Sequence, residues 1–190
     1  LQLGFGTFYN RYGFRYVPYK YSLNLSASYT TESLHSAFHF KGIFNQIIRG
    51  ISVHLDIKKS RLLRSDYFGY GNDTVFDDSL DEDDYYDYVE DYFIFKPSIH
   101  FKLFKRGIAE LGAAYRHSDF DLAEMSLLKH FPLGDYGMED FDSIELNAAF
   151  RYDSRDNSAN PYKGIYLELS GLHSPNLLDN KHAYTKAGFD

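Results

Sequence analysis

Cysteine and tryptophan are both absent from this chain of 190 residues. Without cysteine there can be no disulfide framework, no cysteine-based zinc site and no thiol nucleophile. No run of 18 apolar residues occurs, which excludes a transmembrane helix. The motifs Gly-x-Ser-x-Gly and His-Glu-x-x-His and a phosphate-binding glycine-rich loop are missing too. We therefore expect neither enzyme activity nor a cofactor.

Basic patches are missing as well, and the net charge of −7 comes from one stretch of the chain. Ten acidic residues and no lysine or arginine lie between Asp73 and Asp91, so the rest of the chain carries +3. No basic stripe points to a nucleic-acid partner. The acidic stretch is typical of a solvated surface loop.

The same acidic loop has an alternative interpretation, because carboxylates are the ligands that Ca²⁺ prefers. The candidate ligands are Asp77, Asp78, Asp81, Asp83 and Asp84. An EF-hand is not matched, since Tyr86 stands where a loop beginning at Asp81 needs its sixth-position glycine. Ion binding thus remains a hypothesis beside that of a solvated loop.

What the chain does have is 17 Phe, 18 Tyr and a strong two-residue alternation of apolar and polar side chains. The alternation is clearest at residues 21–29, 51–57, 93–103, 144–152 and 165–169. A period of two predicts β-strands, and we expect about nine, each close to the roughly 9–11 residues that cross a bilayer at a tilt. A last strand begins near His182, and only Leu122–Lys129 has helical spacing.

The expected connections alternate in length along the chain. Short turns are predicted at 10–13, 48–50, 105–107 and 153–164, and between them lie long loops at 60–92 and 117–142 with shorter ones at 31–34 and 174–181. Tight turns at one end and larger loops at the other are typical of a transmembrane barrel. The predicted fold class is all-β: an antiparallel up-and-down transmembrane β-barrel in the bacterial outer membrane, with the apolar alternates facing lipid.

The alternating polar positions carry charges of both signs. The basic members are Lys58, Lys96, Lys102, Arg116 and Arg151, and the acidic ones are Asp56, Glu110, Glu145, Asp153 and Glu168. Charges away from water survive by pairing, so the set predicts either a cross-strand network that fills the lumen or a pore whose selectivity it tunes. The sequence leaves both open.

Two histidine arrangements are candidate chemical sites. His35 and His39 are four residues apart but roughly 13 Å apart on a strand, too far for a metal clamp. Ser98, His100 and Glu110 could form a Ser-His-acid site of the kind used by outer-membrane phospholipases, but no motif supports one. We expect no catalytic residue and no metal ligand set outside the acidic loop.

The segment Tyr152-Asp-Ser-Arg155-Asp156-Asn157-Ser-Ala-Asn-Pro161-Tyr-Lys-Gly164-Ile-Tyr-Leu-Glu-Leu-Ser170 resembles the strand–turn–strand signature of the BamA/TamA outer-membrane assembly superfamily, the bacterial surface antigens. The marker residues are Arg155, Asp156, Pro161 and Gly164. Pro161 fixes φ and Gly164 permits positive φ, while Arg155 and Asp156 could pair across the turn or cap its amides. We interpret them as fold markers.

The resemblance implies an outer-membrane barrel that helps to insert or secrete other outer-membrane proteins. The implied partners are outer-membrane lipid, lipopolysaccharide, and client or partner outer-membrane proteins. The alternatives are a passive channel and a barrel that anchors an attached domain. Since barrels of one chain have an even strand number, residues 1–190 are expected to be one incomplete barrel domain, without POTRA repeats or the final strands.

Overall fold

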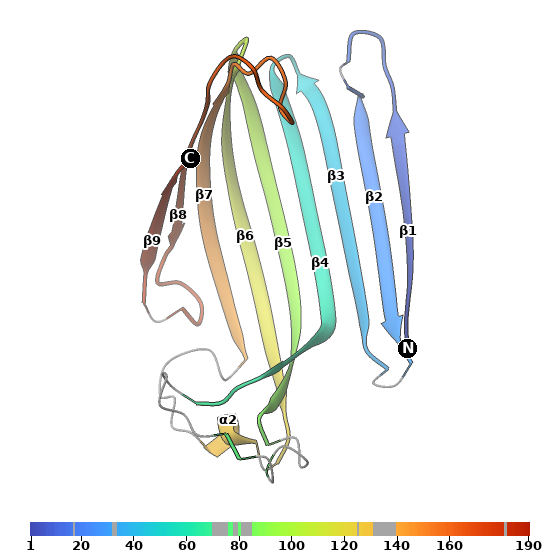
Figure 1. Ribbon diagram of the computed structural model, residues 1–190, viewed down its shortest axis with the longest axis vertical. Helices are drawn as coiled ribbons and strands as arrows, with labels where there is room; N and C mark the ends of the chain where they lie inside the picture. The colour runs from blue at the N-terminus through green and yellow to red at the C-terminus, as the bar shows by residue number, and fades with distance from the viewer. Residues whose placement is uncertain are drawn as a thin grey trace.

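The computed structural model describes residues 1–190 except 17, 32–33, 70–75, 78–79, 81–84, 125, 131–139 and 181. In the described part, nine strands form a single antiparallel sheet, and each strand pairs only with its neighbours in sequence. Figure 1 shows this sheet as one curved wall, with β1 and β9 at its two edges. The all-β antiparallel meander is therefore confirmed.

The strands vary more in length than the alternation predicts. They are β1 (Gln2–Arg11), β2 (Tyr21–Thr30), β3 (Ser36–Ile48), β4 (Ile51–Asp66), β5 (Asp87–Phe104), β6 (Gly107–Leu122), β7 (Phe141–Asp153), β8 (Tyr166–Ser174) and β9 (Tyr184–Phe189). A four-residue helix, α2 (Leu127–His130), precedes β7. No helix of the described residues is long and apolar enough to cross a membrane.

The strand register sorts the side chains onto two chemically different faces. One row across the sheet consists of Leu25, Phe40, Ile57, Phe95, Tyr115 and Ile144, each directly opposite the next. The adjacent row, one residue along, contains Asn24, Lys41, Asp56 and Lys96. Directly opposed residues lie on the same face of a sheet, so one face is apolar and the other polar.

Burial identifies the polar face as the inner one. The buried side chains of the strands are Ser60, Glu90, Ser98, Ala114, Ser118 and Ser174, and the register places all six on the polar face. Apolar side chains such as Phe5, Ile99 and Leu111 are 42–70 % exposed on the other face. Leu23, Leu55 and Leu167 share the apolar face, as the barrel interpretation requires.

The connections segregate to the two ends of the wall. The turns after β1, β3, β5 and β7 lie together at the upper end in Figure 1, and the loops after β2, β4, β6 and β8 lie at the lower end. We call these the turn end and the loop end. This segregation fits a barrel that crosses a bilayer. The expected difference in length holds for the turns 49–50 and 105–106 against the loops 67–86 and 123–140. The first turn, however, spans 12–20 rather than 10–13, and it and the turn 154–165 are longer than the loop 31–35.

The expected boundaries of the two long loops were wrong. β4 continues to Asp66 and β5 begins at Asp87, so this loop is 67–86 rather than 60–92. β6 likewise runs on to Leu122. At 16–18 residues, these three strands exceed the roughly 9–11 needed to cross a bilayer, and they extend beyond it at the loop end.

A small apolar cluster supports this extension. Tyr86 and Leu128 are each 3 % exposed, and the rings of Phe68 and Phe76 lie 5.2 Å from that of Tyr86. The amide of Leu127 donates to the carbonyl of Tyr85 at 2.7 Å, which joins α2 to the β4–β5 loop. The expected helix at 122–129 is limited to the single turn Leu127–His130, and Leu122 is the last residue of β6.

Candidate functional site

The polar inner face near the turn end is organised around Glu110 of β6. Its carboxylate lies 3.6 Å from the guanidinium of Arg151, accepts from Asn147 at 3.4 Å and lies 3.8 Å from His100 Nδ1. Arg151 also donates to Glu168 on β8 at 2.8 Å. This network ties four neighbouring strands together by paired charges, as expected for charges removed from bulk water.

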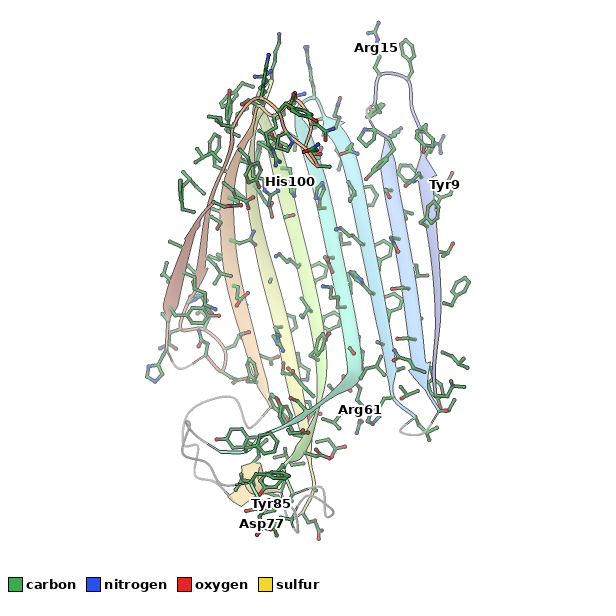
Figure 2. The ribbon with its side chains drawn as sticks, in the orientation of Figure 1. Tyr9, Arg15, Arg61, Asp77, Tyr85 and His100 are labelled. Atoms are coloured by element: carbon green, nitrogen blue, oxygen red, sulfur yellow. The ribbon has the colours of Figure 1, made fainter. Side chains whose placement is uncertain are left out.

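Ser98, His100 and Glu110 do come together in the fold. Ser98 Oγ lies 3.0 Å from His100 Nε2, and His100 in turn faces Glu110. Figure 2 places His100 near the turn end of the wall. The three residues are the candidate Ser-His-acid site of the sequence.

The surroundings of these three residues do not complete a hydrolase site. Ser98 is 8 % exposed and sits in mid-strand, paired with His54 on one side and Gly112 on the other. An oxyanion hole needs backbone amides that are free to point at the reacting oxygen, whereas ladder amides point at neighbouring strands. His100 instead stacks on His54 with ring centroids 3.7 Å apart, and Glu110 is shared with Arg151.

Near the loop end a second charged group lies on the same face. Glu90 is 6 % exposed, and its Oε1 accepts from Arg116 at 2.5 Å and from Ser118 at 2.8 Å. Arg116 also lies over the ring of Tyr92, with Cζ 5.4 Å from its centroid. On β3 and β4 of the same face, His39 Nε2 lies 3.0 Å from Asp56 Oδ1. Of the five basic residues expected on this face, Arg116 and Arg151 pair with carboxylates, so both the network and the pore interpretations stay open.

Within the described residues, no group of three or more His, Asp or Glu side chains is placed to hold a metal ion. Of the five candidate carboxylates in the acidic loop, only Asp77 is described, and its amide donates to the hydroxyl of Tyr86 at 3.0 Å. Asp78, Asp81, Asp83 and Asp84 lie outside the described residues. Ion binding by this loop stays a prediction.

The β7–β8 turn is held by Arg155, which forms a two-pronged pair with Asp153. Arg155 Nε and Nη2 donate to the two oxygens of Asp153 at 2.9 and 2.8 Å. The guanidinium also lies 4.5 Å from the ring centroid of Tyr166. Of the two roles expected for Arg155 and Asp156, Arg155 takes the pairing role, but with Asp153. Asp153, the last residue of β7, was expected only as one of the inner-face charges.

Asp156 takes the capping role. Its Oδ1 accepts from the backbone amides of Asn157, Tyr162 and Lys163 at 3.0–3.2 Å. These amides, above all that of Lys163, hold the pKa of Asp156 below its usual value. Donation to the charged form of a carboxyl stabilises that form.

Gly164 is required for the close approach of the two arms of this turn. Its φ is +102°, and a Cβ there would lie 2.3 Å from the carbonyl oxygen of Ser154. The amide of Ser154 donates to the carbonyl of Ile165 at 2.9 Å, which brings the arms together. Only glycine combines this backbone conformation with this contact.

A one-layered antiparallel wall, apolar outside and polar inside, with turns at one end and loops at the other, defines an outer-membrane β-barrel domain. The family model described as the Omp85 superfamily domain matches residues 1–190, so the chain belongs to the Omp85 superfamily. Its members reside in outer membranes and are assembly and translocation factors, and their barrel domains are non-enzymatic. A comparison with curated proteins finds none that matches.

The resemblance inferred from the Arg155–Gly164 turn is thereby confirmed at the level of the superfamily. Because these barrel domains are non-enzymatic, the contact between Ser98 and His100 is interpreted as part of the inner-wall network.

Proposed function

We propose that this chain forms part of a barrel that helps to insert or secrete other outer-membrane proteins. The observation that carries the proposal is the match of all 190 residues to a superfamily of assembly and translocation factors. A sheet with one lipid-compatible face and one polar face agrees with it. No single side chain is assigned a chemical step, because the work is done by the wall as a whole.

The physical task of such a barrel is to supply backbone hydrogen bonds where lipid cannot. A client strand that enters the hydrocarbon layer unpaired leaves its N–H and C=O groups unsatisfied, at several kcal/mol for each group. A barrel with a weak seam offers a sheet edge on which such a strand can pair. Local thinning of the bilayer beside the seam would lower the remaining free-energy cost of inserting the client strand.

The open sheet supports the further proposal that the nine strands belong to a larger closed barrel. In the described part, β1 and β9 each have one edge without a neighbouring strand. Such edges are not tolerated in contact with lipid, since their backbone groups would stay unpaired. Additional strands would complete the wall between them.

We orient the barrel with the turn end toward the periplasm and the loop end toward the exterior. The loops 31–35, 67–86, 123–140 and 175–183 hold thirteen acidic residues and two lysines. Short periplasmic turns and long external loops are the usual arrangement in outer-membrane barrels. Client proteins arriving from the periplasm would meet the turn end first.

The deciding experiment is depletion of the full-length protein, followed by measurement of the folded, heat-modifiable fraction of other outer-membrane barrels. We expect a broad loss of folded barrels that a wild-type gene copy restores. Outer-membrane lipoproteins that contain no barrel serve as the control and should stay at their normal level.

Unchanged barrel levels after depletion would contradict the assembly role. Steady conductance of the purified protein in planar bilayers would then identify a passive channel, which the polar inner wall makes the main competing function. An unaltered outer membrane without conductance would instead point to a barrel that anchors another domain.

A further inference from the structure

The four turns at the turn end share a feature that the assembly function does not require. In or directly before each turn, a large apolar or aromatic residue is followed at once by a cation. The pairs are Phe14–Arg15, Ile48–Arg49, Phe104–Lys105 and Tyr162–Lys163. The apolar members are 86, 65, 50 and 83 % exposed, respectively. Figure 2 shows Arg15 at the outermost point of its turn.

The charge of this rim is strongly positive. The turns 12–20, 49–50, 105–106 and 154–165 contain seven lysines and arginines and one acidic residue, Asp156. Within the described residues, Arg15, Arg49, Lys105 and Lys163 take part in no ion pair. Arg15 lies over the ring of Phe14, 5.0 Å from its centroid. These four rim cations are therefore available to a ligand, whereas Arg155 of the same rim pairs with Asp153.

Aromatic residues on the apolar face mark the depth of this rim. Tyr9, Tyr21 and Phe44 form a row with ring centroids 6.0 and 6.3 Å apart. Phe104 lies 6.3 Å from Phe150 and 6.2 Å from Tyr152 on the same face. Aromatic girdles of barrels sit at the boundary between hydrocarbon and headgroups. The four cations follow just beyond this boundary, at headgroup depth.

We propose that the turn rim binds anionic phospholipids of the periplasmic leaflet. The apolar member of each pair enters the acyl boundary and the cation following it meets the lipid phosphate, a geometry that combines apolar burial with charge attraction. The repetition on four successive turns favours lipid over a protein partner. A leaflet surrounds the barrel and meets every turn, whereas a docked protein would need only one sector.

The proposal uses the orientation given above but not the assembly function. It can therefore hold even when depletion leaves other barrels unchanged, because lipid binding is measured on the purified protein alone.

The test is the association of spin-labelled phosphatidylglycerol, relative to spin-labelled phosphatidylcholine, with the full-length protein in bilayers, followed by electron paramagnetic resonance. The wild-type protein should prefer phosphatidylglycerol, and salt should weaken this preference by screening. The R15Q/R49Q/K105Q/K163Q variant should lower the preference by about two-fold or more, since one cation near an anionic surface changes binding roughly five-fold.

Two matched variants keep the result interpretable. K58Q/K96Q removes two cations from the polar inner face, away from lipid, and should leave the preference unchanged, while R49Q/K105Q removes two from the rim and should lower it. R15K/R49K should retain the preference, because binding to a lipid phosphate depends on the positive charge, which lysine keeps, and not on the two-pronged hydrogen bonding of the guanidinium. Heat-modifiable migration shows that each variant is folded.

An equal association of both lipids with the wild-type protein would overturn the proposal. So would an unchanged preference in the folded quadruple variant. Loss of a co-purifying periplasmic protein in that variant, with lipid preference intact, would assign the rim to a protein partner instead.

Discussion

At the scale of single residues, the β7–β8 turn shows how few side chains hold the turn end in shape. Arg155 is fixed by Asp153 and Tyr166, Asp156 collects three backbone amides, and Gly164 allows the arms to close. Arg155 thus pairs with a charge, Asp156 caps backbone amides, and Gly164 supplies the backbone conformation. Pro161 is exposed and contributes its restricted φ.

Replacing Gly164 by valine should destabilise the folded barrel. The added Cβ meets the carbonyl of Ser154 at 2.3 Å, and a positive φ of this kind costs a β-branched residue about 1–3 kcal/mol. Gly171→Ala is the matched control, because a Cβ at Gly171 has nothing within 4 Å. Urea titration followed by heat-modifiable migration measures the difference. Equal midpoints for the two variants would contradict the role of Gly164.

The stability of the same turn should depend on pH through Asp156. Its pKa is depressed in the folded state, so its contribution is present above the unfolded value of about 3.9 and is lost as the pH falls through the lower folded value. Amide-exchange protection of Tyr162 and Lys163 should therefore persist at pH 5 and decline below about pH 4.

Asp156→Asn supplies the control for this pH dependence. The amide oxygen of asparagine still accepts hydrogen bonds but carries no charge, so protection should be lower at neutral pH and flat between pH 5 and 3. Protection factors rather than raw exchange rates are compared, since they remove the intrinsic pH dependence of exchange. A wild-type protein with equally flat protection would contradict the account.

At the scale of elements, the alternation of side chains predicted the faces of the strands well and their ends poorly. Residues 51–57 and 144–152 show why the faces could be predicted. In a sheet between lipid and a polar lumen, apolar and polar side chains must alternate, and this alternation is visible in the sequence. The ends were missed because β5 begins in the acidic stretch, at Asp87, where alternation is hidden by charge. Pairing with β4 and β6 maintains the strand there.

The inner-wall contacts were predictable only as a set. All ten charged residues assigned to the polar alternates lie on the polar face. Which partners they choose depends on register, which is fixed by turn lengths across several hairpins. The contacts of Glu110 join residues 51 positions apart by number, from His100 to Arg151, and no local pattern encodes them.

An arginine in place of Leu55 should destabilise the barrel by roughly 2–4 kcal/mol, the range for a charge on the lipid face near the middle of the bilayer. Leu55 lies on the apolar face between Gly42 and Pro97. Lys58→Arg, on the polar face opposite His39, is the control and should have little effect. The free energy of unfolding in liposomes measures both. A tolerated Leu55→Arg would place this face away from lipid.

At the scale of the whole molecule, the distribution of charge follows the faces and ends of the wall. Ion pairs such as Glu90–Arg116 and Glu110–Arg151 lie on the inner face, apolar side chains cover the outer face, and cations gather at the turn end. The two ends of the wall thus differ in charge, as expected in a membrane whose two sides differ in composition. The superfamily places the domain in an outer membrane, and the proposed orientation assigns the cationic rim to the periplasmic leaflet.

The most direct test of this architecture is cysteine scanning through residues 51–58 of β4 and 93–100 of β5 in the full-length protein, made cysteine-free elsewhere. A membrane-impermeant thiol reagent should label polar-face positions such as Ser52, His54 and Asp56, and a bilayer-soluble reagent should label Val53, Leu55 and Ile57. The account predicts this strict alternation in intact outer membranes. Uniform labelling by the water-soluble reagent, or the reverse alternation, would contradict the assignment of the two faces and with it the membrane-spanning wall.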